Sequence, residues 1–329
     1  MNNDEKLELY FKEAQEIIPS IKFSSSLYFG DGNNNKAEIE FSIGNKIIES
    51  LFKSIETSEY IHYTNLQSFI EILNSSKIRM HNCANLNDPR EIEYGLQEFG
   101  LELTPSIIEE FKRNHFIFSA CNYGISLPED FSMWRFYGDN GKGIGIIFEI
   151  ENGEEDYQNH GIHIGNVQYG NNNDKMKLLK QFFEFHFNFN LKHNLFSSQI
   201  PTLFPLMSSF FKKEIWQIEN EFRIVANCKL QNDFYPIENS IKNNCNSFLK
   251  ETIKSTLNKK GEIVSYLELP IKSINNNKLS ILCPKILIKE IKIGYDVSSK
   301  VKESILRLTK QIGTEKLGYD IQYSDSIFK

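Results

Sequence analysis

The stretch "YIHYTNLQSFIEIL" at residues 60–73 decides the fold, because it places a strand directly before a helix. The apolar and aromatic run "YIHY" is typical of a strand, and either Thr64 or Asn65 can cap the helix that follows. Apolar residues then recur at helical spacing and predict the buried face of that helix: Leu66, Phe69, Ile70 and Leu73. A histidine beside a hydroxyl residue at this junction indicates either a turn between two core elements or one wall of a ligand site.

Strands and helices are intermixed on both sides of this stretch. The patterning predicts helices at 5–18, 45–55, 65–73, 91–100 and 298–310, and mainly helical structure over 174–215. It predicts strands at 60–63, 77–83, 115–121, 142–150, 162–170, 219–230, 263–269, 286–295 and 319–324, and two more strands joined by an Asn-rich turn over 21–44. No regular βαβ alternation is present, so the pattern favours an α+β fold.

Two regions differ in pattern. Residues 1–56 are predicted to form an N-terminal extension of helix and strand, and residues 57–329 the main domain, with a helical insert at about 174–215. The insert carries the run "FFEFHFNFNL" (residues 182–191), which can belong to a lid, a recognition element or the core. Core packing is the most common use of such aromatic runs, and it is the interpretation we favour.

Composition restricts the class of protein. Hydrophobic residues make up 40% and charged residues 24% of the 329, which is typical of soluble globular domains. A net charge of −6 argues against broad, non-specific binding of nucleic acid, although a local basic patch such as 250–260 leaves a specific interaction open. No apolar run of about 18 residues predicts a membrane span, and the acidic N-terminus lacks the apolar core of a signal peptide. The five cysteines are scattered, so we expect no disulfide framework and no zinc site, and a cytoplasmic location.

The segment "EIWQIENEFRIVA" (residues 214–226) carries the most distinctive charge pattern. If it is one strand, Glu219, Glu221 and Arg223 share a face, because alternate residues of a strand point the same way. The ordinary interpretation is an exposed ladder in which glutamate and arginine satisfy each other. The alternative is a pair of site carboxylates with a guanidinium beside them.

Three further features have both an ordinary and a functional interpretation. In "MWRFYG", Trp134 and Tyr137 can form a stacking platform, although tryptophan usually packs in a core. Ser119 lies in a buried-looking strand without the G-x-S-x-G context of an acyl-transfer nucleophile. The "GKGIG" run at 141–145 precedes a strand rather than a helix, so it lacks the helix N-terminus of a phosphate loop.

Five segments in this order resemble DUF2971, a bacterial domain family of unassigned function. They read "HYTNLQSFIEIL", "NLNDPREIEYG", "FIFSACN", "MWRFYGDNGKGIGIIFE" and "IWQIENEFRI". The resemblance runs from about residue 60 to at least 226, and through "IKEIKIGYD" to about 295. DUF2971 in turn resembles a distant branch of the ADP-ribosyltransferase superfamily, which implies a mixed or antiparallel split β-sheet with flanking helices.

The superfamily resemblance implies that NAD is the substrate and that no metal is needed. It implies that Glu221 stabilises the positive charge on the ribose and that Glu219 positions the acceptor. It further implies ligand contacts from His62, Tyr63, Thr64, Arg79, Ser119, Trp134, Tyr137 and Arg223. Two departures stand out: histidine occupies position 62 where another branch has arginine, and the insert makes the spacing from residue 62 to 221 long.

These features lead us to expect an NAD-dependent ADP-ribosyltransferase, used as a toxin or anti-phage effector against nucleic acid or protein. The alternatives are an NAD glycohydrolase, a non-catalytic sensor of a nucleotide or phage ligand, and a Mg²⁺-dependent nuclease built on Glu219 and Glu221. The nuclease ranks last because "ENEFR" offers arginine where such sites usually have lysine. The acceptor and the oligomeric state stay open.

Overall fold

The computed structural model describes residues 1–22, 36–53, 59–86, 88, 90–100, 104–124, 129–151, 161–170, 173–196, 203–227, 253–257, 261–272 and 283–328. Within them, only the backbone is described for 36–42 and 203–205. No helix among these residues is both long enough and apolar enough to cross a membrane.

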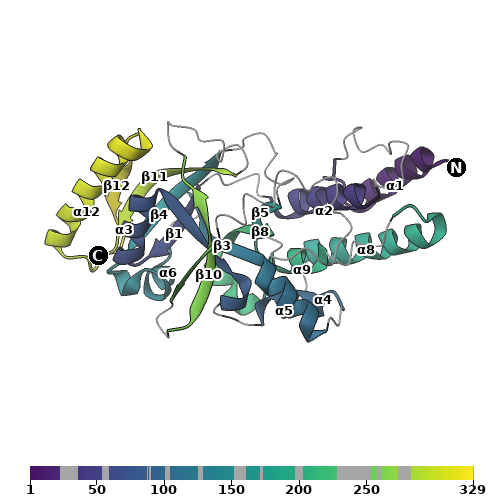
Figure 1. Ribbon diagram of the computed structural model, residues 1–329, viewed down its shortest axis with the longest axis horizontal. Coiled ribbons are helices and arrows are strands. Elements are labelled where there is room, and N and C mark those ends of the chain that lie inside the picture. Colours follow the sequence, from purple (N-terminus) through teal and green to yellow (C-terminus); the bar gives the residue numbers. More distant parts are fainter. Residues whose placement is uncertain are drawn as a thin grey trace.

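One sheet of ten described strands organises the molecule (Figure 1). The path of paired strands runs β12-β11-β4-β1-β3-β2-β10-β9, with β8 pairing to β3 and β5 pairing to β8. The strands are β1 (Glu59–Thr64), β2 (Lys77–Asn82), β3 (His115–Tyr123), β4 (Ile144–Glu151), β5 (Ile162–Asn166), β8 (Glu221–Asn227), β9 (Ile253–Leu257), β10 (Ile263–Pro270), β11 (Lys285–Ile293) and β12 (Gln322–Asp325). A separate parallel pair joins β6 (Gln168–Tyr169) to β7 (Phe211–Lys212).

The helices are α1 (Asn3–Ile17), α2 (Lys36–Phe52), α3 (Leu66–Ser75), α4 (Glu91–Glu98), α5 (Pro105–Asn114), α6 (Phe131–Phe136), α8 (Asp174–His193), α9 (Leu203–Ser208) and α12 (Ser299–Ile312). Short 3₁₀ turns are η3 (Cys83–Asn85), η4 (Asp139–Gly141) and η6 (Glu214–Glu219), and η8 (Gly313–Leu317) is a π-helical turn. The mixed, largely antiparallel sheet with flanking helices confirms the predicted α+β class. The more specific likeness to ADP-ribosyltransferases stays a prediction.

Strand β3 is a branch point in the sheet. Cys121 pairs with Ile61 of β1 on one edge and with Glu221 of β8 on the other. Toward the start of β3, Ile117 pairs with His81 of β2 on the same edge that β1 uses. Strand β8 pairs with the opposite edge there as well. Strands β1 and β2 therefore share one edge of β3 at its two ends, and α3 is the connection between them.

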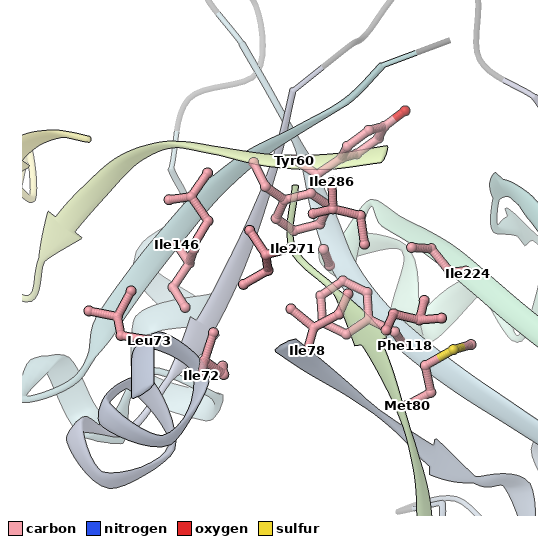
Figure 2. Close-up of a cluster of buried hydrophobic side chains, with 14 of the residues drawn as sticks. Tyr60, Ile72, Leu73, Ile78, Met80, Phe118, Ile146, Ile224, Ile271 and Ile286 are labelled. Carbon is pink, nitrogen blue, oxygen red and sulfur yellow. The ribbon is translucent and has the colours of Figure 1, made fainter. Parts of the chain in front are cut away.

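Side chains on one face of this branched sheet form the larger core, and we call that face the inner face. Figure 2 shows Tyr60, Ile78, Phe118, Ile146 and Ile224 converging from five strands. Helix α3 adds Ile72 and Leu73, and an isolated parallel bridge brings Ile271 of the segment after β10 against Ile286 of β11. The opposite, outer face carries Ile61, Ile117 and Val225.

Helix α3 begins as predicted, with one correction to its buried face. Asn65 is the cap, and its side chain accepts a hydrogen bond from the Ser68 amide at 2.9 Å. Phe69 and Leu73 are buried as expected, but Ile70 is 43% exposed and Ile72 is buried in its place. Phe69, Ile72 and Leu73 therefore form the side of the helix that packs in the core.

Helices α1, α2 and α8 extend away from the sheet as an arm (Figure 1). Tyr10 of α1 lies at its centre: the ring contacts Phe182, Phe185 and Phe189 of α8, and its hydroxyl is 2.8 Å from His186 Nδ1. The Phe-rich run of the insert is therefore mostly core packing, as predicted. The same core continues through α2 to Ile117 and Val225 on the outer face of the sheet.

The prediction of two strands over 21–44 is wrong for residues 36–44, which begin α2; residues 23–35 lie outside the described part. The alternation of Ile39, Phe41 and Ile43 fits a strand. However, Ile43, Ile47 and Leu51 recur at helical spacing and are all buried, so packing of the arm selects the helix. The insert also departs from the prediction after Ser208, where β7 and η6 replace helix.

A close approach between α2 and β5 gives a test of this packing. A Cβ atom added to Gly165 of β5 would lie 2.5 Å from the Cβ of Phe52, so only glycine fits there. We expect Gly165→Ala to lower the free energy of unfolding by about 1–3 kcal/mol through overpacking. Urea unfolding measures this, with Gly124→Ala as the control, because a Cβ at Gly124 meets nothing within 4 Å. Equal stability of the two variants would contradict the described contact.

Buried histidines predict a loss of stability in mild acid. Burial lowers the pKa of His62, His163 and His186 to about 4 and that of His115 to about 3. Each binds its proton more readily in the unfolded chain, where its pKa is about 6.5. The free energy of unfolding therefore has its full value above about pH 6.5. It falls as the pH drops toward 4, by up to about 1.4 kcal/mol per pH unit for each histidine. Urea midpoints that do not change between pH 7 and 5 would contradict this.

Candidate functional site

A buried network of charges lies on the outer face of β8. Arg223 is 1% exposed, and its guanidinium binds both carboxylate oxygens of Glu221, with Nε–Oε1 at 2.7 Å and Nη2–Oε2 at 3.0 Å. It also pairs with Glu91 of α4 and donates to the backbone carbonyl of Ser209. One buried guanidinium thus joins a strand, a helix and the loop after α9.

Lys212 of β7 is the second cation of the network. Its Nζ lies 2.7 Å from Glu219 Oε2, 2.7 Å from Glu221 Oε2 and 3.5 Å from Glu91 Oε2. Three carboxyl groups from three elements therefore converge on one ammonium group. When all three are ionised, the two cations leave one negative charge uncompensated.

A left-handed residue allows the two central carboxylates to meet. Glu219 ends η6, and Asn220 has φ 40° and ψ 54°, so the chain turns before β8 begins at Glu221. Asn220 is held in place because its backbone carbonyl accepts hydrogen bonds from the backbone amide and the side-chain amide of Asn122. The strand predicted to begin at Glu219 therefore begins two residues later, yet Glu219 and Glu221 both reach Lys212.

The predicted exposed ladder of glutamate and arginine is wrong, because Glu219 and Glu221 are only 5% and 4% exposed. Burial alone would raise the pKa of Glu221, but Arg223 and Lys212 outweigh it and hold that pKa at about 2. Burial dominates at Glu91, whose pKa is raised above its usual value despite the same two cations. Glu221 is thus a permanent anion, and Glu91 is protonated more readily.

The network reaches the surface beside Glu219. Tyr137 is 41% exposed and its hydroxyl donates to Glu219 Oε1 at 2.5 Å. Trp216 is 39% exposed, and Lys212 Nζ lies 5.9 Å from the centre of its ring. We call the large exposed side chains here the rim: Phe136, Tyr137, Ile215, Trp216 and Ile218.

The surroundings of Tyr137 keep its hydroxyl protonated. Burial raises the pKa of its hydroxyl, and the hydrogen bond to Glu219 raises it further. Tyr137 therefore remains a proton donor throughout the physiological pH range. The arrangement presents a carboxylate, oriented by a phenol and an ammonium group, next to exposed aromatic rings.

Two predicted aromatic contacts belong to the core instead of the rim. Trp134 is fully buried, and its Nε1 donates to Glu129 Oε2 at 2.8 Å. Tyr63 is also buried; its ring packs edge-on against Trp134 at 5.0 Å, and its hydroxyl accepts a hydrogen bond from the Asp130 amide at 3.4 Å. Both support α6, which leads into Tyr137.

The histidine of "HYT" lies on the other face of the sheet. His62 pairs with Ile146 and Thr64 with Ile144, whose side chains belong to the inner core, whereas Glu221 and Arg223 point outward. The Nδ1 of His62 is 3.0 Å from the carbonyl of Ser119; that oxygen can only accept, so Nδ1 carries the hydrogen. The structure thus does not bring His62 and Thr64 to the carboxylates.

Arg79 and Ser119 complete the predicted set. Arg79 of β2 pairs with Glu71 at 2.9 Å and lies over the Tyr266 ring at 4.6 Å. Ser119 pairs with Arg223 across β3 and β8, so it lies beside the network on the outer face. Of the ten predicted residues, Glu219, Glu221, Arg223, Tyr137 and Ser119 are brought together.

Sequence reasoning missed Lys212, Glu91 and Tyr169. The Tyr169 hydroxyl accepts a hydrogen bond from the Glu221 amide at 2.7 Å and so fixes the start of β8. Lys212 follows two phenylalanines in "FFKKE", and a lysine directly after a buried apolar pair is a usable signal for a buried cation. Glu91 stands at the first position of α4, where acidic residues are common, so nothing marks it.

The same contacts bear on metal binding. Within the described residues, no group of three or more histidine, cysteine or acidic side chains has the geometry to hold a metal ion. Lys212 and Arg223 occupy the space between the three carboxyl groups. Protein cations therefore compensate the carboxylates here.

Arg223 gives a test of the network. Lysine keeps the charge but lacks the planar fork of donors, so Arg223→Lys cannot serve Glu91, Glu221 and Ser209 together. We expect this variant to lose about 3–5 kcal/mol of unfolding free energy, because it leaves buried groups unpaired. The control Arg79→Lys alters an exposed pair, and we expect a change within about 1 kcal/mol. Similar losses in both variants, measured by urea unfolding, would contradict the described network.

One part of the chain matches a known protein family. Residues 133–224 match the family described as protein of unknown function (DUF2971). The match runs from α6 to β8 and includes Tyr137, Glu219, Glu221 and Arg223. The segments resembling the family before residue 133 lie outside it. No curated protein and no solved structure matched the chain. The part of the chain that carries Lys212, Glu219, Glu221 and Arg223 is thus similar to the DUF2971 family.

Proposed function

We propose that this protein cleaves the bond between nicotinamide and ribose in NAD and transfers the ADP-ribosyl group to an acceptor. The observation that carries the proposal is the buried carboxylate Glu219, oriented by Tyr137 and Lys212 where the network opens onto the aromatic rim. The resemblance to ADP-ribosyltransferases supports the choice of NAD.

The chemistry requires an anion at the ribose. As the bond from C1′ to the nicotinamide nitrogen breaks, its electron pair leaves with nicotinamide and positive charge develops on the ribose. A preorganised carboxylate lowers the energy of that state. The acceptor then bonds to C1′, and its proton passes to a carboxylate acting as base.

The contacts favour Glu219 for the group that meets the ribose, with Glu221 behind it. Both Glu221 oxygens bind Arg223, and one of them also binds Lys212. Glu219 instead contacts Tyr137, which is exposed. We therefore assign Glu221 a positioning role, in contrast to the expectation from the sequence.

The rim fits the leaving group. The nicotinamide ring of NAD is flat and positively charged, and such rings bind well over aromatic faces. Tyr137 and Trp216 are the exposed aromatics around Glu219, and the network beneath them has a surplus negative charge when fully ionised. The acceptor, nucleic acid or protein, and the use as a toxin or in anti-phage defence stay predictions.

A second candidate is a sensor that binds the nucleotide without turnover. It is favoured by the fact that all four oxygens of Glu219 and Glu221 already have a cationic or hydroxyl partner. A substrate that bonds to one of these oxygens has to share it with the partner already there, whereas a ligand that only binds the rim need not.

Incubation with NAD separates the two functions. We expect the protein to release nicotinamide in the presence of bulk RNA, DNA or cell lysate, and Glu219→Gln to reduce the rate by about 10²–10³-fold. The matched control is Glu214→Gln, an exposed glutamate on the same η6 turn, which should release nicotinamide at the wild-type rate.

Two results would redirect the assignment. Thermal stabilisation by NAD without nicotinamide release would favour the sensor. Neither release nor stabilisation, in protein with an intact unfolding transition, would contradict both functions.

A further inference from the structure

Phe52, the last residue of α2 in the arm, contacts the two residues directly before Lys212. Its ring is fully buried and stacks on Phe210, with ring centres 5.0 Å apart and planes 22° apart. It also meets Phe211 edge-on, at 5.4 Å and 85°. Phe211 and Lys212 are the two residues of β7, so the Phe52 ring contacts the strand that carries the ammonium group of the network.

The absence of a side chain at Gly165 makes this contact possible. An added Cβ would lie 2.5 Å from the Phe52 Cβ and 3.1 Å from Phe210 Cε1. The helix α2 therefore lies directly on β5, and Phe52 fills the space between β5 and the Phe210–Phe211 pair. Close-packed apolar contacts of this kind transmit a shift in one element to its neighbour.

The backbone at Lys212 is held by a short strand pairing, in which the Lys212 carbonyl accepts a hydrogen bond from the Gly170 amide at 3.0 Å. Strand β7 is two residues long and pairs only with β6 among the described strands. The adjacent Phe211 is packed by Phe52 and by Phe99. The placement of Nζ between Glu219 and Glu221 thus depends on how these rings hold the strand.

We infer that Phe52 is a positioning residue for Lys212. Through Phe52, the arm of α1, α2 and α8 controls the geometry of the charge network. A partner or ligand that moves α2 would alter the contacts of Lys212 with Glu219 and Glu221. This goes beyond the proposed function and does not rest on it, because the inference concerns the network itself, whichever reaction or ligand the network serves.

The indole N–H resonances of the two tryptophans test the inference. Trp216 lies over Lys212, whereas Trp134 is buried beside Glu129, so one indole reports on the network and the other on the α6 core. The protein is labelled with ¹⁵N-tryptophan, and Trp216→Phe assigns the two peaks. We expect Phe52→Ala to shift the Trp216 peak and to leave the Trp134 peak in place.

Phe189→Ala is the matched control, because it removes a buried aromatic ring from the same arm. Phe189 contacts Tyr10, Phe185 and His193, all within the arm. We expect it to lower stability without moving either indole peak. An unmoved Trp216 peak in Phe52→Ala, or an equal shift in Phe189→Ala, would overturn the inference.

Phe52→Leu provides a second variant if the alanine substitution prevents folding. Leucine keeps an apolar group against Phe210 and Phe211 but cannot stack as a ring does. We expect the Trp216 indole peak to shift in Phe52→Leu as well, by less than in Phe52→Ala. A Trp216 peak identical to the wild type in folded Phe52→Leu would count against the inference.

Discussion

The buried guanidinium of Arg223 is the constraint on which the site depends. Removing a charge from water costs several kcal/mol, and the cost is recovered only with well-placed partners on every side. Arg223 meets this requirement with Glu221 on its own strand, Glu91 on α4 and the Ser209 carbonyl after α9. These elements must therefore converge for Arg223 to be buried with its charge compensated. Lys212 then joins the same carboxylates and connects them to Glu219 at the surface.

The branched sheet determines which residues can act together. Because β8 follows one edge of β3, its outward residues Glu221 and Arg223 lie under α4, β7 and the turn after α6. Strand β1 lies on the other edge, and its alternation sends His62 inward to the Ser119 carbonyl. In the "HYT" segment, Tyr63 thus packs against Trp134 of α6, and His62 binds the backbone of β3 at the branch point of the sheet. The site is built mainly from residues in the middle of the sequence, between Tyr137 and Arg223.

Much of the fold could be predicted from local pattern. The strand and helix at residues 59–75, a helix cap at Thr64 or Asn65 and the α+β class follow from periodicity and capping chemistry, and the structure selects Asn65 as the cap. The site was harder, because pairing between distant elements decides burial. The sequence predicts Glu219 and Glu221 as site residues, but their burial depends on Lys212 and Glu91, which no local pattern connects to them. Likewise, residues 36–44 alternate like a strand although they begin α2, whose buried face at Ile43, Ile47 and Leu51 is set by packing.

The central claim is that Lys212 and Glu219 stabilise each other inside one network. A double-mutant cycle with Lys212→Met and Glu219→Gln, followed by urea unfolding, tests it most directly. Lys212→Met leaves the buried Glu219 carboxylate without its cation, and Glu219→Gln removes one of the carboxylates around Lys212, whereas the double variant removes both charges. We predict that the double variant is less destabilised than the sum of the single variants by about 1–3 kcal/mol. Additivity within about 0.5 kcal/mol would contradict the account.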